Sequence, residues 1–122
     1  MRADPADGLP GIGETGRYLG VRPDIDIPVD ENRGVEPGAG GMSVVPPPMT
    51  NLAPHRLPRE FGGRSRDPVF ELDTDELPEG LTYRPDPDNP EGHGFVEPAR
   101  RMPFEEFERA IHETRGLWRP VR

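Results

Sequence analysis

Three histidines, His55, His93 and His112, are the side chains of this sequence whose ordinary pKa lies near neutral pH. Two of them could form the acid–base pair that ribonuclease-type cleavage of a phosphodiester requires, with an arginine stabilising the transition state. None stands at metal-ligand spacing from another, so the sequence predicts no metal site. The alternative for each histidine is a structural place on the surface or at a loop anchor.

One glutamate, Glu97, is a candidate for a functional carboxylate because of its position at the end of a strand. It closes an expected strand in which alternation places Phe95 and Glu97 on the same face. Burying a carboxylate on an apolar face costs free energy, so such a carboxylate is expected to have a partner or a chemical role. Ser43 lies within an apolar strand and could hold a carboxylate by a hydrogen bond, or simply pack. The alternative is that Glu97 is merely exposed at the edge of a groove.

All 15 basic side chains are arginine, and the chain contains neither lysine nor cysteine. This composition excludes lysine Schiff bases, thiolate nucleophiles and iron–sulfur sites. Guanidinium groups bind phosphates and carboxylates through paired hydrogen bonds, so this arginine content is compatible with the binding of small phosphorylated ligands. The formal net charge of −8 argues against a nucleic-acid backbone as the main partner. Basic groups are dense in the expected surface loop 49–68, which includes His55 and Arg56.

The elements that must position these groups are short. A helix is expected from Pro103 to Arg115, because apolar side chains recur with helical spacing from Phe104 and Gly116 supplies a stop. The predicted fold class is α+β: a small mixed or antiparallel sheet of about five short strands, one C-terminal amphipathic helix and long Pro/Gly-rich loops. The expected strands lie at 17–22, 42–45, 69–73, 81–84 and 94–97.

The length of 122 residues fits one domain. Residues 1–16 are aperiodic and rich in Gly, Pro and Asp, so we expect a flexible N-terminal arm followed by a single domain over 17–122. No stretch approaches the ~18 apolar residues of a membrane span, and residues 1–10 lack the apolar core of a secretory signal. We therefore expect a cytoplasmic protein, with any delivery into a target cell proceeding without a cleavable signal peptide.

Several short motifs follow one another in an order that resembles a toxin family. Gly-Arg-Tyr-Leu at 16–19 precedes Gly-Gly-Met-Ser-Val at 40–44, and a Pro-Glu-Gly-Leu turn precedes Arg-x-Asp at 84–86. His-x-x-Val-x-Pro at 93–98 then leads to Met102 and to a helix ending near Trp118. This order is similar to the ADP-ribosyltransferase-like toxin domain of a small type VI secretion effector and of related bacterial toxin-locus proteins. The resemblance covers about residues 16–119.

The resemblance implies a compact mixed sheet and the transfer of ADP-ribose from NAD to a cellular target. That group offers a basic residue on the first strand, a serine on the second and a catalytic glutamate on a later one. Carried over by position, these are Arg17 or Arg22, Ser43 and Glu97. Glu97 would stabilise the oxocarbenium-like state, and Ser43 would position the Glu97 carboxylate. His93 is a further catalytic candidate.

The remaining implied roles concern the cofactor-like substrate NAD and the partners. Arg17 or Arg22 would bind the pyrophosphate, with Arg56 as the alternative. Tyr18 or Tyr83 could stack on the nicotinamide ring. The implied partners are a cognate immunity protein and an acceptor in the intoxicated cell, with neither nucleic acid nor membrane expected.

Two other functions compete with this interpretation. One is a metal-independent ribonuclease toxin that uses His55 or His93, and the other is a non-enzymatic interaction protein that binds through its Pro-rich loops and helix. The transferase requires Glu97, Ser43 and an arginine to meet in one concave pocket. The ribonuclease requires a histidine pair within reach of a shared proton, whereas the interaction protein requires no pocket with convergent polar groups.

Overall fold

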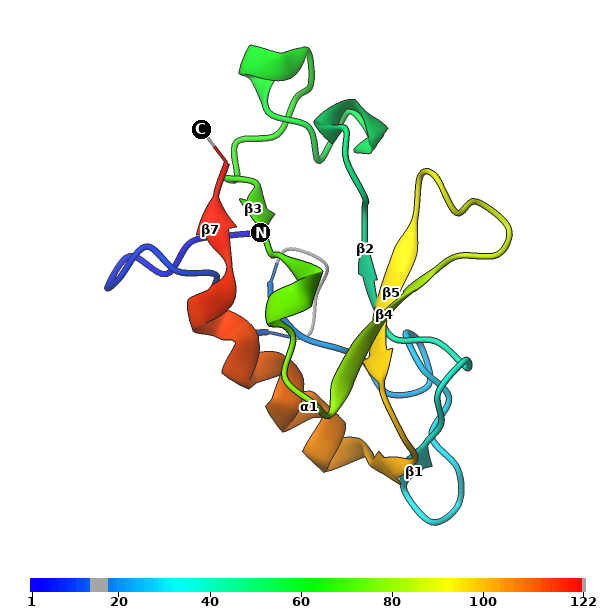
Figure 1. Cartoon of the computed structure of the whole chain (residues 1–122). Coiled ribbons are helices and arrows are strands. Elements are labelled where there is room, and N and C mark those ends of the chain that lie inside the picture. The colour runs from blue at the N-terminus through cyan, green and yellow to red at the C-terminus, as the bar shows by residue number, and fades with distance from the viewer. Residues whose placement is uncertain (14–17, 122) are drawn as a thin grey trace.

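The computed structural model describes residues 1–13 and 18–121 of the chain (Figure 1). It shows short antiparallel strands in small sheets and one C-terminal helix, which confirms the predicted α+β class. The helix α1 spans Phe104–Glu113 and continues as a 3-10 turn, η4, over Thr114–Leu117. Pro103 lies just outside the helix as its N-terminal cap, so α1 begins one residue later than predicted.

The largest sheet has three antiparallel strands in the order β2–β5–β4, comprising Met42–Val44, Gly94–Pro98 and Leu81–Pro85. Met42 and Tyr83 both pair with Val96, so these three side chains share one side of the sheet, which we call the core face. Met42 and Val96 are buried in the hydrophobic core that α1 also joins.

The opposite side of the same sheet is called the outer face. Ser43 and Arg84 both pair with Phe95, and Thr82 pairs with Glu97, so their side chains point away from the core face. Ser43 and Thr82 are exposed there. The predicted placement of Phe95 and Glu97 on one face is confirmed.

Two small sheets and three 3-10 turns complete the fold. The predicted strand at 17–22 is absent from its described part, because Leu19 forms only an isolated bridge with Ile12. Leu19 and Val21 are nevertheless buried on alternate positions, as a strand would place them. The two small sheets pair β1 (Gly34–Val35) with β6 (Met102–Pro103) and β3 (Phe70–Glu71) with β7 (Arg119–Pro120). The turns are η1 (Met49–Asn51), η2 (Arg59–Phe61) and η3 (Thr74–Glu76).

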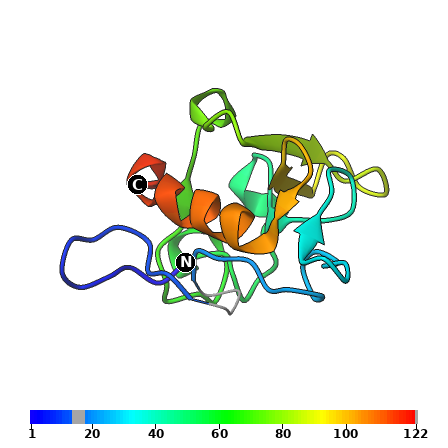
Figure 2. The same ribbon diagram turned by 90° about the horizontal axis from the view of Figure 1, so that it is seen from below.

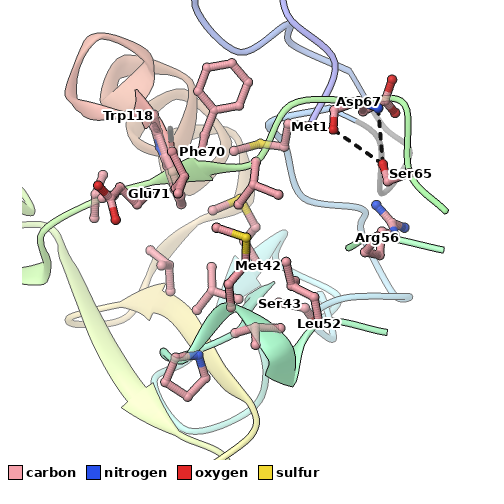
Figure 3. A pocket seen from close by; sticks show the side chains of 18 of the residues that line it. Met1, Met42, Ser43, Leu52, Arg56, Ser65, Asp67, Phe70, Glu71 and Trp118 are labelled. Atoms are coloured by element: carbon pink, nitrogen blue, oxygen red, sulfur yellow. Dashed lines mark hydrogen bonds between the residues drawn. The ribbon is translucent and has the colours of Figure 1, made fainter. Parts of the chain in front are cut away.

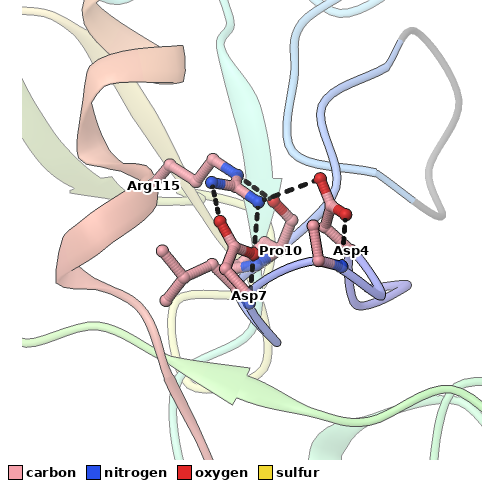
Figure 4. Close-up of polar contacts among 6 residues, drawn as sticks. Asp4, Asp7, Pro10 and Arg115 are labelled. Carbon is pink, nitrogen blue, oxygen red and sulfur yellow. Dashed lines mark hydrogen bonds and ion pairs between the residues drawn. The ribbon is translucent and has the colours of Figure 1, made fainter.

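The described part of the N-terminal arm, residues 1–13, forms a loop near the C-terminal end of the helix (Figure 2), and hydrogen bonds anchor it there. Arg115, at the end of the helix, donates to the carboxylate of Asp7 at 2.7 Å and to the carbonyl oxygen of Pro10 at 2.7 Å, and it also pairs with Asp4 (Figure 4). The Leu19 amide donates to the Gly11 carbonyl at 2.7 Å. One guanidinium therefore binds three acceptors of the arm at once and anchors the arm to the end of the helix, while the flexibility of the arm stays a prediction.

The core draws on both regular and irregular segments. Phe107 and Ile111 of α1 are fully buried, as their helical spacing predicts. Leu19 and Ile27 come from segments without regular strands and are equally buried. Burial of each such side chain contributes about 1.5–3 kcal/mol, so packing stabilises these irregular segments as it does the helix.

Candidate functional site

A cavity of about 1410 Å³ opens between the core face of the three-stranded sheet and the β3–β7 pair (Figure 3). The sheet contributes Met42 and Tyr83, the opposite side contributes Phe70 and Trp118, and the loop from Val45 to Asp67 supplies much of the remaining lining. Pockets that hold small ligands usually measure ~300–1,000 Å³, so this one has room for a dinucleotide-sized molecule.

Two of the aromatic side chains that line the cavity, Trp118 and Tyr83, are held in place by neighbouring residues. The Trp118 Nε1–H donates to Thr114 Oγ1 at 3.0 Å, and this hydroxyl donates to the Ile111 carbonyl at 2.6 Å. Tyr83 lies over Gly94 on the core face, where a Cβ would approach the tyrosine ring to 2.4 Å. The absence of a side chain at Gly94 is therefore what allows the Tyr83 ring to take this place.

Basic side chains gather on the loop side of the cavity. Arg22 is already committed, because its Nε and Nη2 bind the Asp26 carboxylate at 3.2 and 3.0 Å. Arg56 also has a partner. Arg64 and Arg66 line the cavity and are exposed, and their guanidinium groups form no hydrogen bond or ion pair within the described part of the chain. They are the guanidinium groups here that an anionic ligand could bind without displacing an internal partner.

Four carboxylates line the same cavity, at Asp26, Asp67, Glu71 and Asp73. Asp26 is bound by Arg22, and Asp73 accepts the backbone N–H of Asp75 at the start of η3. Glu71 is exposed in β3. Asp67 is half-buried, and its backbone N–H donates to Ser65 Oγ at 3.1 Å, which holds this corner of the loop together.

Glu97 lies on the outer face, away from the cavity. This residue is only 5% exposed, and its Oε2 accepts from Arg84 Nε at 2.9 Å and from the backbone N–H of Gly38 at 2.8 Å. The Arg84 guanidinium in turn stacks 4.8 Å from the centre of the Phe95 ring. The buried carboxylate thus has two donors, and its observed partners explain its burial without a bound substrate.

His93 closes the hairpin between β4 and β5. Its Nδ1 lies 2.8 Å from Asp86 Oδ2, and the Asp86 backbone N–H donates to the His93 carbonyl at 3.0 Å. The hydrogen bond from the imidazole lowers the pKa of Asp86 below its ordinary value. The ring also meets Phe95 edge to face, with centroids 4.8 Å apart. His55 lines the cavity instead, and no contact joins the two imidazoles among the described residues.

The sheet separates the residues that the sequence hypothesis assigned to one site. The catalytic candidates Glu97, Ser43 and His93 belong to the outer face or to the hairpin, although the Ser43 position also borders the cavity. Ser43 makes no hydrogen bond to Glu97. The structure does not bring Glu97, Ser43 and an arginine together in this cavity, because strand alternation directs the Glu97 side chain to the outer face. The candidates for NAD binding that do line the cavity are Tyr18, Arg22, Arg56 and Tyr83.

Other parts of the site were not foreseen. Arg17, a candidate for pyrophosphate binding, lies outside the described residues. Phe70, Trp118, Arg64 and Arg66 were not among the candidate site residues. The available signal was the density of arginines in the loop 49–68, which carries four of them. The two aromatic residues carry no such signal, because apolar spacing alone marks them only as core.

Comparisons with models of protein families, with curated proteins and with solved structures find no match to this chain. Within residues 1–13 and 18–121, no helix is long and apolar enough to cross a bilayer. The same residues contain no group of three or more histidine, aspartate and glutamate side chains placed to hold a metal ion.

Proposed function

We propose that the cavity binds NAD and that the chain is a toxin domain of the ADP-ribosyltransferase-like class, transferring ADP-ribose to a cellular target. The observation that carries this proposal is that a single cavity is lined both by aromatic side chains and by arginines whose guanidinium groups have no internal partner. Four of the residues that the resemblance assigned to NAD, including Tyr18 and Arg56, line it. The order of sequence motifs is the second support.

The two chemical parts of NAD match two parts of the cavity. The flat rings would lie between Tyr83 on the sheet side of the cavity and Phe70 and Trp118 on the opposite side, where apolar and aromatic surface is already assembled. The pyrophosphate would lie at Arg64 and Arg66, since a guanidinium binds phosphate oxygens through two hydrogen bonds. Arg22 serves instead as an internal brace, because its Nε and Nη2 already bind the Asp26 carboxylate.

The proposed reaction breaks the bond between the nicotinamide nitrogen and ribose C1′. The bonding electrons leave with neutral nicotinamide, and the oxocarbenium-like sugar is attacked at C1′ by a nucleophile of the acceptor, which loses its proton. A carboxylate beside the sugar stabilises the developing positive charge. Within the cavity we assign this role to Asp67, the half-buried carboxylate on the arginine side. Glu97 supports the sheet from the other face.

The first experiment measures NAD binding by calorimetry. The double variant Arg64→Ala/Arg66→Ala should weaken binding by about tenfold or more, because two charge-assisted contacts are lost. Arg109→Ala/Arg119→Ala is the matched control, since these arginines are also uncommitted among the described residues but do not line the cavity. Equal affinities of all three proteins, or equal losses in both variants, would contradict the assigned site.

The second experiment follows the chemistry and its consequence. Asp67→Asn should lower the rate of nicotinamide release about a hundredfold, while NAD affinity changes far less. Expression of the chain in a bacterium should arrest growth, and co-expression of a cognate immunity protein should relieve the arrest. Normal growth together with no detectable nicotinamide release would contradict the proposed activity, even if NAD binds.

A further inference from the structure

Unpaired positive charge is concentrated in one small part of this acidic protein. Of the arginines that the structure describes, those whose guanidinium group has no hydrogen bond, ion pair or ring contact are few, and most of them fall within the segment 53–66. We call this segment the arginine loop. Its acidic content is the single residue Glu60. The uncommitted arginines are Arg59, Arg64 and Arg66 in the loop and Arg109 and Arg119 outside it.

The arginine loop is folded by its own backbone. The amide of Leu57 donates to the carbonyl of Ala53, that of Arg64 donates to Pro54 at 2.7 Å, and that of Ser65 donates to Leu57 at 2.9 Å. Gly62 takes a left-handed φ of 94° at the end of η2. The guanidinium groups are therefore carried on an ordered scaffold, so binding costs less ordering entropy than it would on an unstructured tail.

An exposed aromatic ring lies among these cations. Phe61 is 41% exposed and is the one aromatic among the large apolar side chains that the described residues leave exposed. It belongs to the same 3-10 turn as Arg59. Aromatic and arginine side chains are the types most enriched in the energetic centres of protein interfaces.

We infer that the arginine loop is a docking surface for an acidic segment of a protein partner, with Phe61 seated in an apolar part of that partner. Discrete carboxylates can meet Arg59 and Arg64 while avoiding nearby acidic residues such as Asp67. A nucleic-acid backbone carries a continuous line of negative charge and would be repelled by the rest of this chain, whose total charge is −8.

Docking at this surface would also bring the partner to the cavity. Arg64 and Arg66 belong both to the arginine loop and to the cavity lining, whereas Arg59 and Phe61 belong to the loop alone. A partner that covers the whole loop should therefore compete with NAD. The expected competition rests on the proposed function, but the docking surface does not.

The test uses a labelled synthetic peptide of alternating glutamate and leucine, titrated against the full chain by fluorescence anisotropy at low salt. Arg59→Glu/Phe61→Ala should weaken binding at least tenfold. The control Arg109→Glu/Ile25→Ala makes the same charge change and also removes an exposed apolar side chain, since Ile25 is 70% exposed. It should weaken binding less than twofold, and thermal unfolding should show that both variants fold.

Three results would overturn the inference. These are no saturable binding of the peptide, equal losses in the two double variants, or tighter binding of a single-stranded DNA of the same length. NAD titration of Arg59→Glu/Phe61→Ala separates the two proposals, because this variant leaves the cavity lining unchanged. Unaltered NAD affinity with lost peptide binding supports the docking surface, whereas absent NAD binding in the unmodified chain counts only against the proposed function.

Discussion

Arg84 and Glu97, on neighbouring strands, form a partly buried ion pair across the outer face, with Arg84 Nε 2.9 Å from Glu97 Oε2. The same oxygen accepts the backbone N–H of Gly38, so the pair also ties the loop before β2 to the sheet. This geometry makes Glu97 a structural carboxylate.

Glu97→Gln should lower the free energy of unfolding by about 2 kcal/mol, because a neutral amide leaves the Arg84 charge without its counter-ion. Urea denaturation measures the loss. The rate of nicotinamide release per folded molecule should stay within about twofold of the unmodified chain, since the Glu97 side chain lies outside the cavity. Full stability with abolished release would instead place the catalytic carboxylate on the outer face.

Gly94→Ala should displace the Tyr83 ring, because the new methyl group would lie 2.4 Å from it. We expect a loss of stability of about 1–3 kcal/mol and weaker NAD binding, since Tyr83 lines the cavity. Gly116→Ala is the control, as its Cβ would meet nothing within 4 Å. Thermal unfolding and calorimetry check both variants. Retained NAD affinity in Gly94→Ala would show that Tyr83 does not contact the ligand.

Acid should loosen the loop that Asp30 and Arg101 hold together. The hydrogen bond from Arg101, with further bonds from the Gly34 and Asn32 amides, lowers the pKa of Asp30 to about 2. Because the pKa of Asp30 is lower in the folded state than in the unfolded chain, the ion pair stabilises the fold fully at a pH above the unfolded-state pKa. This stabilisation is lost as the pH falls through the folded-state pKa. NMR titration should place the Asp30 midpoint near pH 2, and Arg101→Ala should move it back toward the ordinary value. A midpoint that stays unmoved in this variant would contradict the pairing.

Arg115→Ala should release the described arm, because its guanidinium binds Asp7, Asp4 and the Pro10 carbonyl together. Hydrogen exchange at the Leu19 amide, which donates to Gly11, should become faster. Arg100→Ala is the control, since Arg100 forms an exposed pair with Glu106. Equal exchange rates in both variants would show that packing, and not the clamp, holds the arm.

The sequence alone was enough for the features that depend on local periodicity. The helical spacing of Phe104, Phe107 and Ile111 predicts both the helix and its buried face, and the structure confirms them. Two-residue alternation correctly placed Phe95 and Glu97 on the same side of a strand. These features follow from the backbone geometry of a single element, so no partner needs to be known.

The tertiary structure decided which side of the sheet faces the cavity and which partner each charge takes. Alternation groups Phe95 with Glu97, but whether that side meets a cavity depends on where β3, β7 and the loop after β2 pack. The partner of Glu97 is an arginine on the adjacent strand, and the arm is held by an arginine 108 residues beyond Asp7. Such pairings depend on chain topology, because Coulomb attraction and hydrogen bonding act over a few ångströms of space and are indifferent to separation along the chain.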